Sequence, residues 1–388
     1  MPDTAIATNT AVAVNQDRLV QTFLALARQN TPPRHERAAS VIARDKLAAL
    51  GFQCKYDDAG EKVGGDIGNL IASKAGSVPG APAVFFSAHF DTVEATSGLE
   101  PIVDGDIIKS DGKTIVGADD KCGLAPILEA MQILHEQGIP HGDIQLLLTI
   151  CEEIGLVGAS HMNPADITAQ YGYVLDSGPP VGSLVYSAPT QDIFEAWISG
   201  RAAHAGAQPE DGISAVLVAA RALSRMKLGR IDHETTANIG IITGGEATNI
   251  IPHECYLKGE VRSRNRDKMD AHRETLFAIL REEADAAGAT VNIDNRTAYT
   301  GYELGMDDPV LALGMQAAER IGLEPLLKVT GGGADANVFN AFGVPTTVLG
   351  CGMVNIHRHD EYCTISDMVK SAQLVVSIVQ TAAERREG

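Results

Sequence analysis

Short apolar runs rich in β-forming residues alternate with amphipathic helical segments, and this alternation restricts the possible folds more than any other feature of the chain. Four runs have the composition of buried strands: 83–88, 143–150, 171–175 and 344–349. Because parallel strands need crossover connections, strands separated by helices predict a mainly parallel or mixed sheet flanked by helices, which is an α/β fold.

The middle of the chain has a different pattern. Its predicted elements follow the order strand, helix, strand, strand, helix, strand, which is the ferredoxin-like α+β order. We therefore expect 187–299 to be a domain inserted into a larger one, which is formed by 17–186 and 300–388. Residues 1–16 are rich in Ala and Thr, and we expect them to form a flexible tail.

Charge and cysteine content limit the partners and the compartment. The 388 residues include 50 Asp and Glu against 31 Lys and Arg, a formal net charge of −19. Such a chain is repelled by phosphate backbones and anionic membrane surfaces, so we expect neither nucleic acid nor membrane as a partner. The six cysteines form no C-x-x-C pair, and no segment has the features of a signal peptide, so we expect a cytoplasmic protein.

Acidic and histidine residues collect where the predicted strands end. The residues concerned are His89, Asp91, Glu152, Glu153, Asp176 and His357, with Asp119 and Asp120 at the start of a predicted helix. Ligands of open α/β sheets bind at the carboxyl ends of the strands, so these side chains are expected to converge. A set of carboxylates and imidazoles without thiolates suits Zn, Mn or Co.

Each of these residues also has an ordinary structural interpretation. A single histidine is more often packed or on the surface than bound to metal, and Asp119 and Asp120 are favoured in a first helical turn. Glu152 and Glu153 could cap the following segment. Together, however, converging carboxylates repel one another, and divalent cations relieve that repulsion. The combined pattern therefore favours a metal site.

The spacing within two pairs suggests separate roles. His89 and Asp91 are two residues apart, so in an extended strand they face the same side, which suits an imidazole ligand oriented by a carboxylate. Glu152 and Glu153 are adjacent and point apart. One of them can then bind metal while the other carries a proton.

These residues belong to motifs that resemble those of the di-zinc aminoacylase/carboxypeptidase metallopeptidases, with the peptidase T-like (tripeptide aminopeptidase) subgroup the most similar. The five metal-site motifs are 89–93, 117–123, 152–155, 176–178 and 355–361, and further matches are 199–206, 249–252, Arg262 and 331–335. The resemblance implies a phosphorylase/hydrolase-like fold of the zinc-exopeptidase type, with the inserted domain as a lid.

The resemblance also implies a ligand set for two divalent ions per chain, zinc first, with cobalt or manganese as alternatives. Asp119 would bridge the ions, His89 and Asp176 would complete one site, and Glu153 and His357 the other. His357 is preferred to His359 because it lies four residues before a glutamate, as the family's ligand does.

The catalytic roles follow from the same resemblance. Glu152 would be the general base and Asp91 the partner that orients His89. A cis peptide bond is implied between Asp119 and Asp120. One departure from the subgroup is Cys122, where alanine or glycine is common, and the chain is also slightly shorter, so its substrate loops can differ.

The lid of this family usually forms a homodimer. His204 would then stabilise the oxyanion in the partner's active site, and Asn249, Arg262, Gly332 and Gly333 would bind the substrate. A surface position for His204 and an ion pair for Arg262 within the lid are the alternatives.

The expected function is a co-catalytic di-metal exopeptidase acting on short peptides, as a peptidase T-like aminopeptidase. A carboxypeptidase or an N-acyl amino-acid amidohydrolase would share the same metal residues, and a non-catalytic dimeric binding protein could share the fold. An NAD-dependent enzyme is disfavoured because no G-x-G-x-x-G opens the first strand–helix unit.

Overall fold

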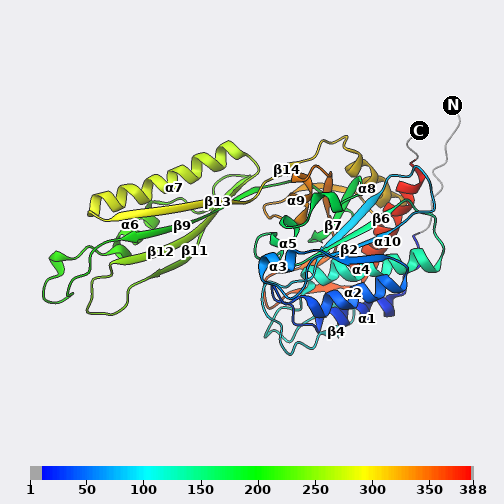
Figure 1. The fold of residues 1–388 in the computed structure, drawn as a ribbon, viewed down its shortest axis with the longest axis horizontal. Coiled ribbons are helices and arrows are strands. Elements are labelled where there is room, and N and C mark those ends of the chain that lie inside the picture. The colour runs from blue at the N-terminus through cyan, green and yellow to red at the C-terminus, as the bar shows by residue number, and fades with distance from the viewer. Residues whose placement is uncertain (1–10, 386–388) are drawn as a thin grey trace. The chain divides into compact units, whose positions relative to one another are not determined.

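The computed structural model describes residues 11–385, and the chain divides into two compact units. Unit 1 comprises the described parts of Met1–Tyr186, Glu303–Val329 and Ala334–Gly388, and unit 2 comprises Ser187–Tyr302 and Thr330–Gly333 (Figure 1). The domain limits expected from the sequence were 186/187 and 299/300. The return of residues 330–333 to unit 2 has no counterpart in that expectation.

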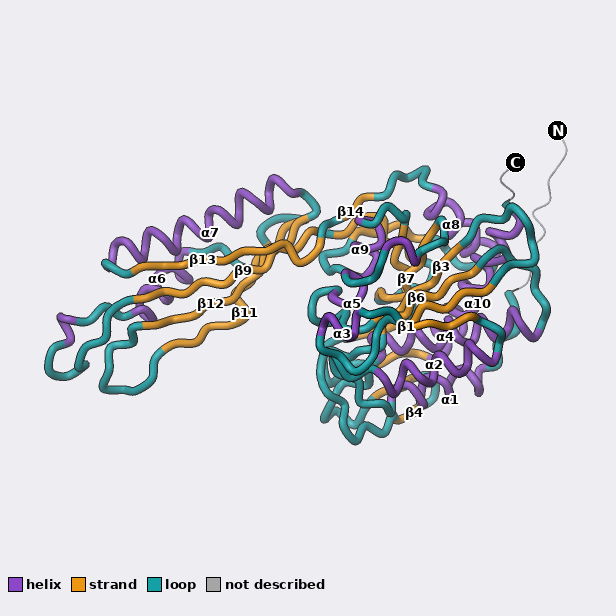
Figure 2. The backbone as a smooth tube through the Cα atoms, in the orientation of Figure 1, coloured by secondary structure: helices purple, strands orange, loops and turns teal. Residues whose placement is uncertain are grey.

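The helices and strands are distinguished in Figure 2. The α-helices are α1 (Gln16–Ala27), α2 (Arg37–Ala49), α3 (Ala59–Val63), α4 (Ala118–Glu136), α5 (Val157–Ser160), α6 (Ala215–Arg225), α7 (Arg266–Ala287), α8 (Pro309–Arg320), α9 (Asp335–Ala341) and α10 (Ile365–Glu384). The strands are β1 (Gln53–Tyr56), β2 (Leu70–Lys74), β3 (Val84–His89), β4 (Ile102–Asp104), β5 (Ile107–Lys109), β6 (Ile144–Thr149), β7 (Tyr171–Ser177), β8 (Ser183–Ala188), β9 (Thr190–Ser199), β10 (Gly229–Arg230), β11 (Thr235–Gly244), β12 (Glu254–Ser263), β13 (Thr290–Tyr299), β14 (Tyr302–Glu303), β15 (Leu326–Val329), β16 (Thr346–Gly350), β17 (Met353–Val354) and β18 (Tyr362–Thr364).

The main sheet of unit 1 is mixed, with a parallel centre. Its order is β1-β2-β6-β3-β7-β16-β8-β14, and β15 pairs with β8. The four central strands, β6, β3, β7 and β16, are parallel to their neighbours within this group. They are the four strands predicted from the apolar runs, so the predicted α/β architecture is confirmed. Because these strands are parallel, their carboxyl ends lie at one edge of the sheet.

Helices bury both faces of this sheet, as the continuous apolar runs predict. Neighbouring residues of β3 point to opposite faces. Phe85 meets Phe339 of α9 edge-on, with ring centroids 5.0 Å apart. Phe86 stacks on Tyr173, whose hydroxyl donates a hydrogen bond to the carbonyl of Val310 in α8. Strand β3 is consequently buried along its whole length, and its last residue has a fixed position.

Unit 2 is an antiparallel sheet with helices α6 and α7 packed on it (Figure 1). The sheet order is β10-β11-β12-β9-β13, so the predicted ferredoxin-like order is present with the two-residue strand β10 added. Alternate residues of β9 face the helices, and Phe194 meets Phe277 of α7 edge-on at 5.2 Å. Unit 2 therefore has a hydrophobic core of its own.

Of the tail expected at residues 1–16, only residues 11–16 belong to the described chain. Residues 1–10 lie outside the described residues. The carbonyl of Val12 accepts a hydrogen bond from the Gln373 side chain, and the Asn15 side chain caps α1, which begins at Gln16. Within the described chain, no helix combines the length and apolar character that a membrane span requires.

Candidate metal centre

The predicted site residues of unit 1 come together at the carboxyl edge of the parallel strands. His89 is the last residue of β3, and Asp176 lies near the end of the adjacent strand β7. Glu152 and Glu153 follow β6 on the other side of β3. Asp119 lies at the start of α4, where the peptide bond to Asp120 is cis, as the resemblance implied.

Four groups of three side chains in the described part of the chain have the spacing of metal ligands, and two of these groups share one residue. The two groups that share a residue are His89, Asp119 and Asp176, and Asp119, Glu153 and His357. Within each group, one candidate donor atom per residue lies within 4.8 Å of the others. A shared carboxylate between two sets of nitrogen and oxygen donors fits a pair of divalent ions. This arrangement contains all five side chains that the resemblance implied as ligands.

The imidazoles of these groups lie directly against their carboxylates. His89 Nε2 lies 2.9 Å from Asp119 Oδ1, and His357 Nε2 lies 3.3 Å from Asp119 Oδ2 and 3.0 Å from Glu153 Oε2. Hydrogen bonds to Asp119 and Glu153 raise the pKa of His357 to about 10. Burial and then the Asp119 charge raise the pKa of Asp176. These pKa shifts reflect a local excess of negative charge, which divalent cations would balance.

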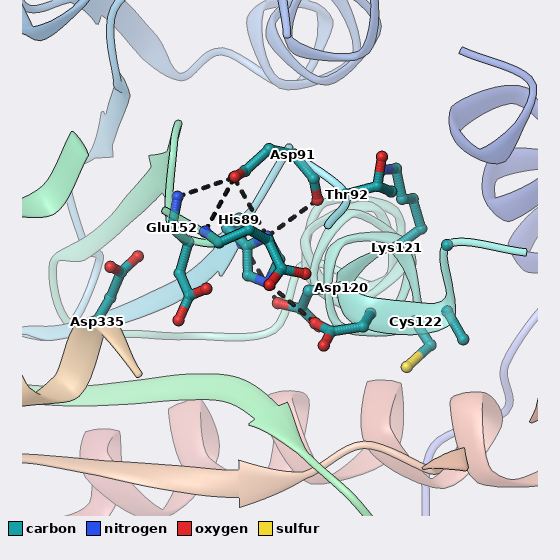
Figure 3. A network of polar contacts seen from close by, with 12 residues as sticks. His89, Asp91, Thr92, Asp120, Lys121, Cys122, Glu152 and Asp335 are labelled. Carbon is teal, nitrogen blue, oxygen red and sulfur yellow. Dashed lines mark hydrogen bonds and ion pairs between the residues drawn. The ribbon is translucent and has the colours of Figure 1, made fainter. Parts of the chain in front are cut away.

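Asp91 contacts one residue of each group, the imidazole of His89 and the backbone amide of Glu153. Its carboxylate lies 3.4 Å from His89 Nδ1, and it accepts hydrogen bonds from the amides of Glu152 and Glu153, both at 3.0 Å (Figure 3). The side chain is fully buried. Asp91 therefore orients an imidazole and also fixes the start of the loop that carries both glutamates.

Glu152 differs from its neighbour in its surroundings. Its side chain is buried, and burial raises the pKa of Glu152 well above the usual range of a carboxyl group. It belongs to neither candidate ligand group, whereas Glu153 does. A buried carboxyl group close to the ligands, but not among them, is suited to take up and release a proton.

Glu361 is a functional candidate that was not predicted as a site residue. Its buried carboxylate accepts hydrogen bonds from the amides of Gly117, Ala118 and Asp119, at 2.7, 3.2 and 3.2 Å. Burial raises the pKa of Glu361 to about 7. The shared candidate ligand Asp119 is thus held by a residue 242 positions away in sequence. The available signal was its place in the motif 355–361.

Two further buried carboxylates support the same edge of the sheet and were not predicted. Glu36 accepts hydrogen bonds from the amides of Arg34 and Cys151, at 2.9 and 3.0 Å, directly before Glu152. Asp335, within the quoted motif 331–335, accepts a 2.5 Å hydrogen bond from the Thr149 hydroxyl at the end of β6. Nothing in the local sequence around Glu36 indicates this role.

The lysine within the acidic motif is directed away from the ligands. Lys121 is fully buried, and its ammonium group donates to the Thr31 hydroxyl and the Phe90 carbonyl, at 2.9 and 3.0 Å. Burial lowers the pKa of Lys121 to about 8.

The cysteine at position 122, where the subgroup commonly has alanine or glycine, is buried. Its thiol packs 3.4 Å from the thiol of Cys351, which is a second small side chain.

The alternative ligand His359 lies outside both candidate groups. Its Nε2 atom pairs with Glu94 Oε1 at 3.1 Å on the surface of unit 1.

The remaining predicted residues belong to unit 2. Arg262 forms two hydrogen bonds with Glu260, at 2.9 and 3.0 Å, and one with the Tyr299 hydroxyl at 3.2 Å, as the ion-pair alternative anticipated. The Tyr299 ring lies against Gly333, where a Cβ atom would approach it to 2.3 Å, so this position requires glycine.

The other three residues form backbone contacts in loops of the same unit. The Asn249 carbonyl accepts a hydrogen bond from the Ala205 amide at 3.0 Å. The Gly332 amide donates to the Thr330 hydroxyl at 3.1 Å. The His204 ring accepts hydrogen bonds from amides of its own loop.

Comparisons with known proteins agree with this geometry. Residues 85–381 match the model of peptidase family M20/M25/M40. The Bacillus subtilis protein named "Uncharacterized protein YqjE" is 40% identical over 371 residues, which cover 96% of this chain and 100% of that protein. The crystal structure of aminopeptidase PepT from Bacillus cereus is 40% identical, has a TM-score of 0.85 and covers 95% of this chain and 99% of that one. For a Staphylococcus aureus tripeptidase, the identity is 36%, the TM-score is 0.90 and the coverage is 96% and 100%.

Proposed function

Since the chain belongs to peptidase family M20/M25/M40 and is therefore a hydrolase, we propose that it is a di-metal aminopeptidase that removes the first residue from short peptides. The observation that carries this proposal is the pair of ligand groups that share Asp119, with the buried Glu152 beside them. The names aminopeptidase PepT and tripeptidase, borne by similar proteins of nearly equal length, support a short peptide as the substrate.

In this proposal, Glu152 moves the proton. When bound, two divalent ions would polarise the scissile carbonyl and make water more acidic. The Glu152 carboxylate takes one proton from the attacking water while the water oxygen bonds to the carbonyl carbon. The same proton then passes to the leaving amine as the C–N bond breaks. Asp91 keeps the Glu152 backbone in place, through the amide that it binds at 3.0 Å.

The residues of unit 2 have proposed roles in binding and in stabilising charge. His204 would donate a hydrogen bond to the oxyanion that forms on the scissile carbonyl. Asn249, Gly332 and Gly333 would bind the peptide backbone. Arg262 would bind the terminal carboxylate of a short peptide, which requires it to share its guanidinium with Glu260.

The substrate can be determined with a matched set of peptides. Hydrolysis of a free tripeptide, its N-acetyl form and its C-terminal amide should be measured by mass spectrometry of the products, together with an N-acetyl amino acid. An aminopeptidase releases the first residue from the free peptide and does not cleave the N-acetyl form. Release of the last residue would instead support a carboxypeptidase, and cleavage of the N-acetyl amino acid an amidohydrolase. No turnover with any added metal would support the binding-protein alternative.

We propose that zinc is the native metal, and the expected stoichiometry is two ions per chain. Metal analysis after saturation and gel filtration should give two ions for the unaltered protein and one for His357→Ala, because only one group contains His357. His359→Ala is the matched control and should retain two ions. A single ion in the unaltered protein, with no change in His357→Ala, would contradict the shared-ligand arrangement.

We also propose a homodimer formed through unit 2, in a cytoplasmic setting that the six free thiols support. Within the described chain, β10 pairs only with Thr236 and Ala237 of β11, so the rest of β11 is a sheet edge. Ile241 and Ile242 are 48% and 53% exposed along it. Exposed apolar edges of this kind invite pairing with a second strand. Ile242→Glu should therefore shift the protein to a monomer in analytical ultracentrifugation, whereas Val329→Glu on unit 1 should not.

A mixing experiment can test whether the dimer forms composite active sites. Glu152→Gln and His204→Ala should each be inactive alone. If His204 serves the partner subunit, random exchange of subunits makes half of the dimers hybrid, and each hybrid has one complete site, so about a quarter of the activity should return. Verified exchange without recovery would show that His204 does not act on the partner subunit.

A further inference from the structure

The loop that carries His204 is held by main-chain contacts within unit 2. His204 forms an isolated antiparallel bridge with Ile250, and the Ala205 amide donates to the Asn249 carbonyl at 3.0 Å. The Gln208 amide donates to the His204 carbonyl at 3.1 Å. The backbone on both sides of the imidazole is therefore fixed, although the side chain itself is exposed.

One nitrogen of the His204 ring is occupied as a hydrogen-bond acceptor. The amides of Gly206 and Ala207 both point at Nδ1, each at 3.1 Å, and the Ala207 amide is shared with the His204 carbonyl at 3.3 Å. A backbone amide can only donate, so Nδ1 must present its lone pair. A neutral imidazole carries one proton, which then resides on Nε2. This deduction needs no assumption about the catalytic reaction.

We propose that the Gly206 and Ala207 amides are positioning groups that hold His204 as the Nε2–H tautomer, so that Nε2 is a fixed donor toward an anionic oxygen. The opposite tautomer would present a lone pair at Nε2 and repel such an oxygen. It would also place an N–H on Nδ1 against two amide N–H groups. The two amides thus determine which ring nitrogen donates, which histidine alone does not specify.

The tautomer can be observed directly. Full-length protein with ¹⁵N-labelled histidine should be examined by long-range ¹H–¹⁵N correlation NMR above neutral pH, with His204 assigned by its absence in His204→Gln. The expected spectrum has a pyridine-like Nδ1 and a pyrrole-like Nε2 for this residue. A protonated Nδ1, or averaged shifts of two exchanging tautomers, would overturn the proposal.

A pair of substitutions tests the cause. Gly206→Pro removes one donating N–H, and Gly206→Ala keeps it; a Cβ atom there would lie 3.7 Å from the His204 ring, an ordinary contact. We expect averaged ring shifts in Gly206→Pro and the unaltered spectrum in Gly206→Ala. An unaltered spectrum in a folded Gly206→Pro would show that this amide does not set the tautomer. If Gly206→Pro does not fold, the spectrum of the unaltered protein still shows which tautomer His204 adopts.

The link to catalysis is a separate measurement and rests on the proposed function. If Nε2 stabilises the oxyanion, Gly206→Pro should lower kcat about 10-fold with little change in KM, because part of the population loses the donor. Gly206→Ala should remain within about twofold of the unaltered enzyme. If the spectra are as expected but Gly206→Pro does not lower kcat, the tautomer assignment stands and the oxyanion role is refuted. An absence of any peptidase activity would refute the proposed function and leave the spectrum unaffected.

Discussion

Replacing Glu152 by Gln should lower kcat at least about 100-fold while the protein keeps its bound metal. The amide has the shape of the carboxyl group but cannot take a proton from water. Glu152 belongs to neither ligand group, so its loss should leave metal binding unaffected. Steady-state kinetics and metal analysis on the same preparation would test both parts of this prediction.

Glu153→Gln is the matched control, since the two side chains are adjacent and chemically identical. Glu153 lies 3.0 Å from His357 and belongs to the second ligand group. Its replacement should therefore weaken the binding of one ion, and added metal should restore part of the activity. If Glu152→Gln loses metal and Glu153→Gln does not, the two roles are reversed.

Glu361→Gln should weaken metal binding by about 10- to 100-fold, although Glu361 is not among the candidate ligands. Its carboxylate accepts three amide hydrogen bonds around Asp119, and the NH₂ group of Gln would face at least one amide donor. Because Asp119 is shared, both ions should be affected. Titration with a competing chelator would measure the two affinities.

Asp360→Asn provides the control for this change. Asp360 is the adjacent acidic residue, but it is exposed, and among the described residues its side chain bonds only to Arg358 and Asn355 of its own loop. Metal affinity should stay within about twofold. Equal losses in both variants would mean that the loop as a whole, rather than the contacts of Glu361 with 117–119, maintains the site.

The α/β fold and the convergence of the candidate ligand residues could be predicted because each depends on local patterns. Apolar runs identified the parallel strands, and the residue following each run necessarily lies at the edge where the strands end. The resemblance then identified the peptidase family, which the comparison confirmed. Distinguishing His357 from His359 needed the resemblance, since spacing along a loop does not determine which ring faces inward.

The residues that support the ligands through the backbone could not be predicted in the same way. Glu36 and Glu361 accept amide hydrogen bonds, and every residue except proline offers an amide, so the residue types around them do not identify their bonding partners, although Glu361 lies within the motif 355–361. The tautomer of His204 depends likewise on where two amides point. The return of residues 330–333 to unit 2 depends on tertiary packing, such as that of Tyr299 against Gly333.

The discontinuity of unit 1 has a consequence for how the protein is made. His89, Asp119, Glu153 and Asp176 precede unit 2 in the chain, whereas His357 and Glu361 follow it. During synthesis the earlier residues emerge first, and the candidate ligand set stays incomplete until the last segment has packed onto the rest of unit 1. Contacts over such sequence separations form slowly. Binding of both metal ions would therefore occur only at the end of folding. Until then, a nascent chain would hold an acidic cluster without the imidazole of His357.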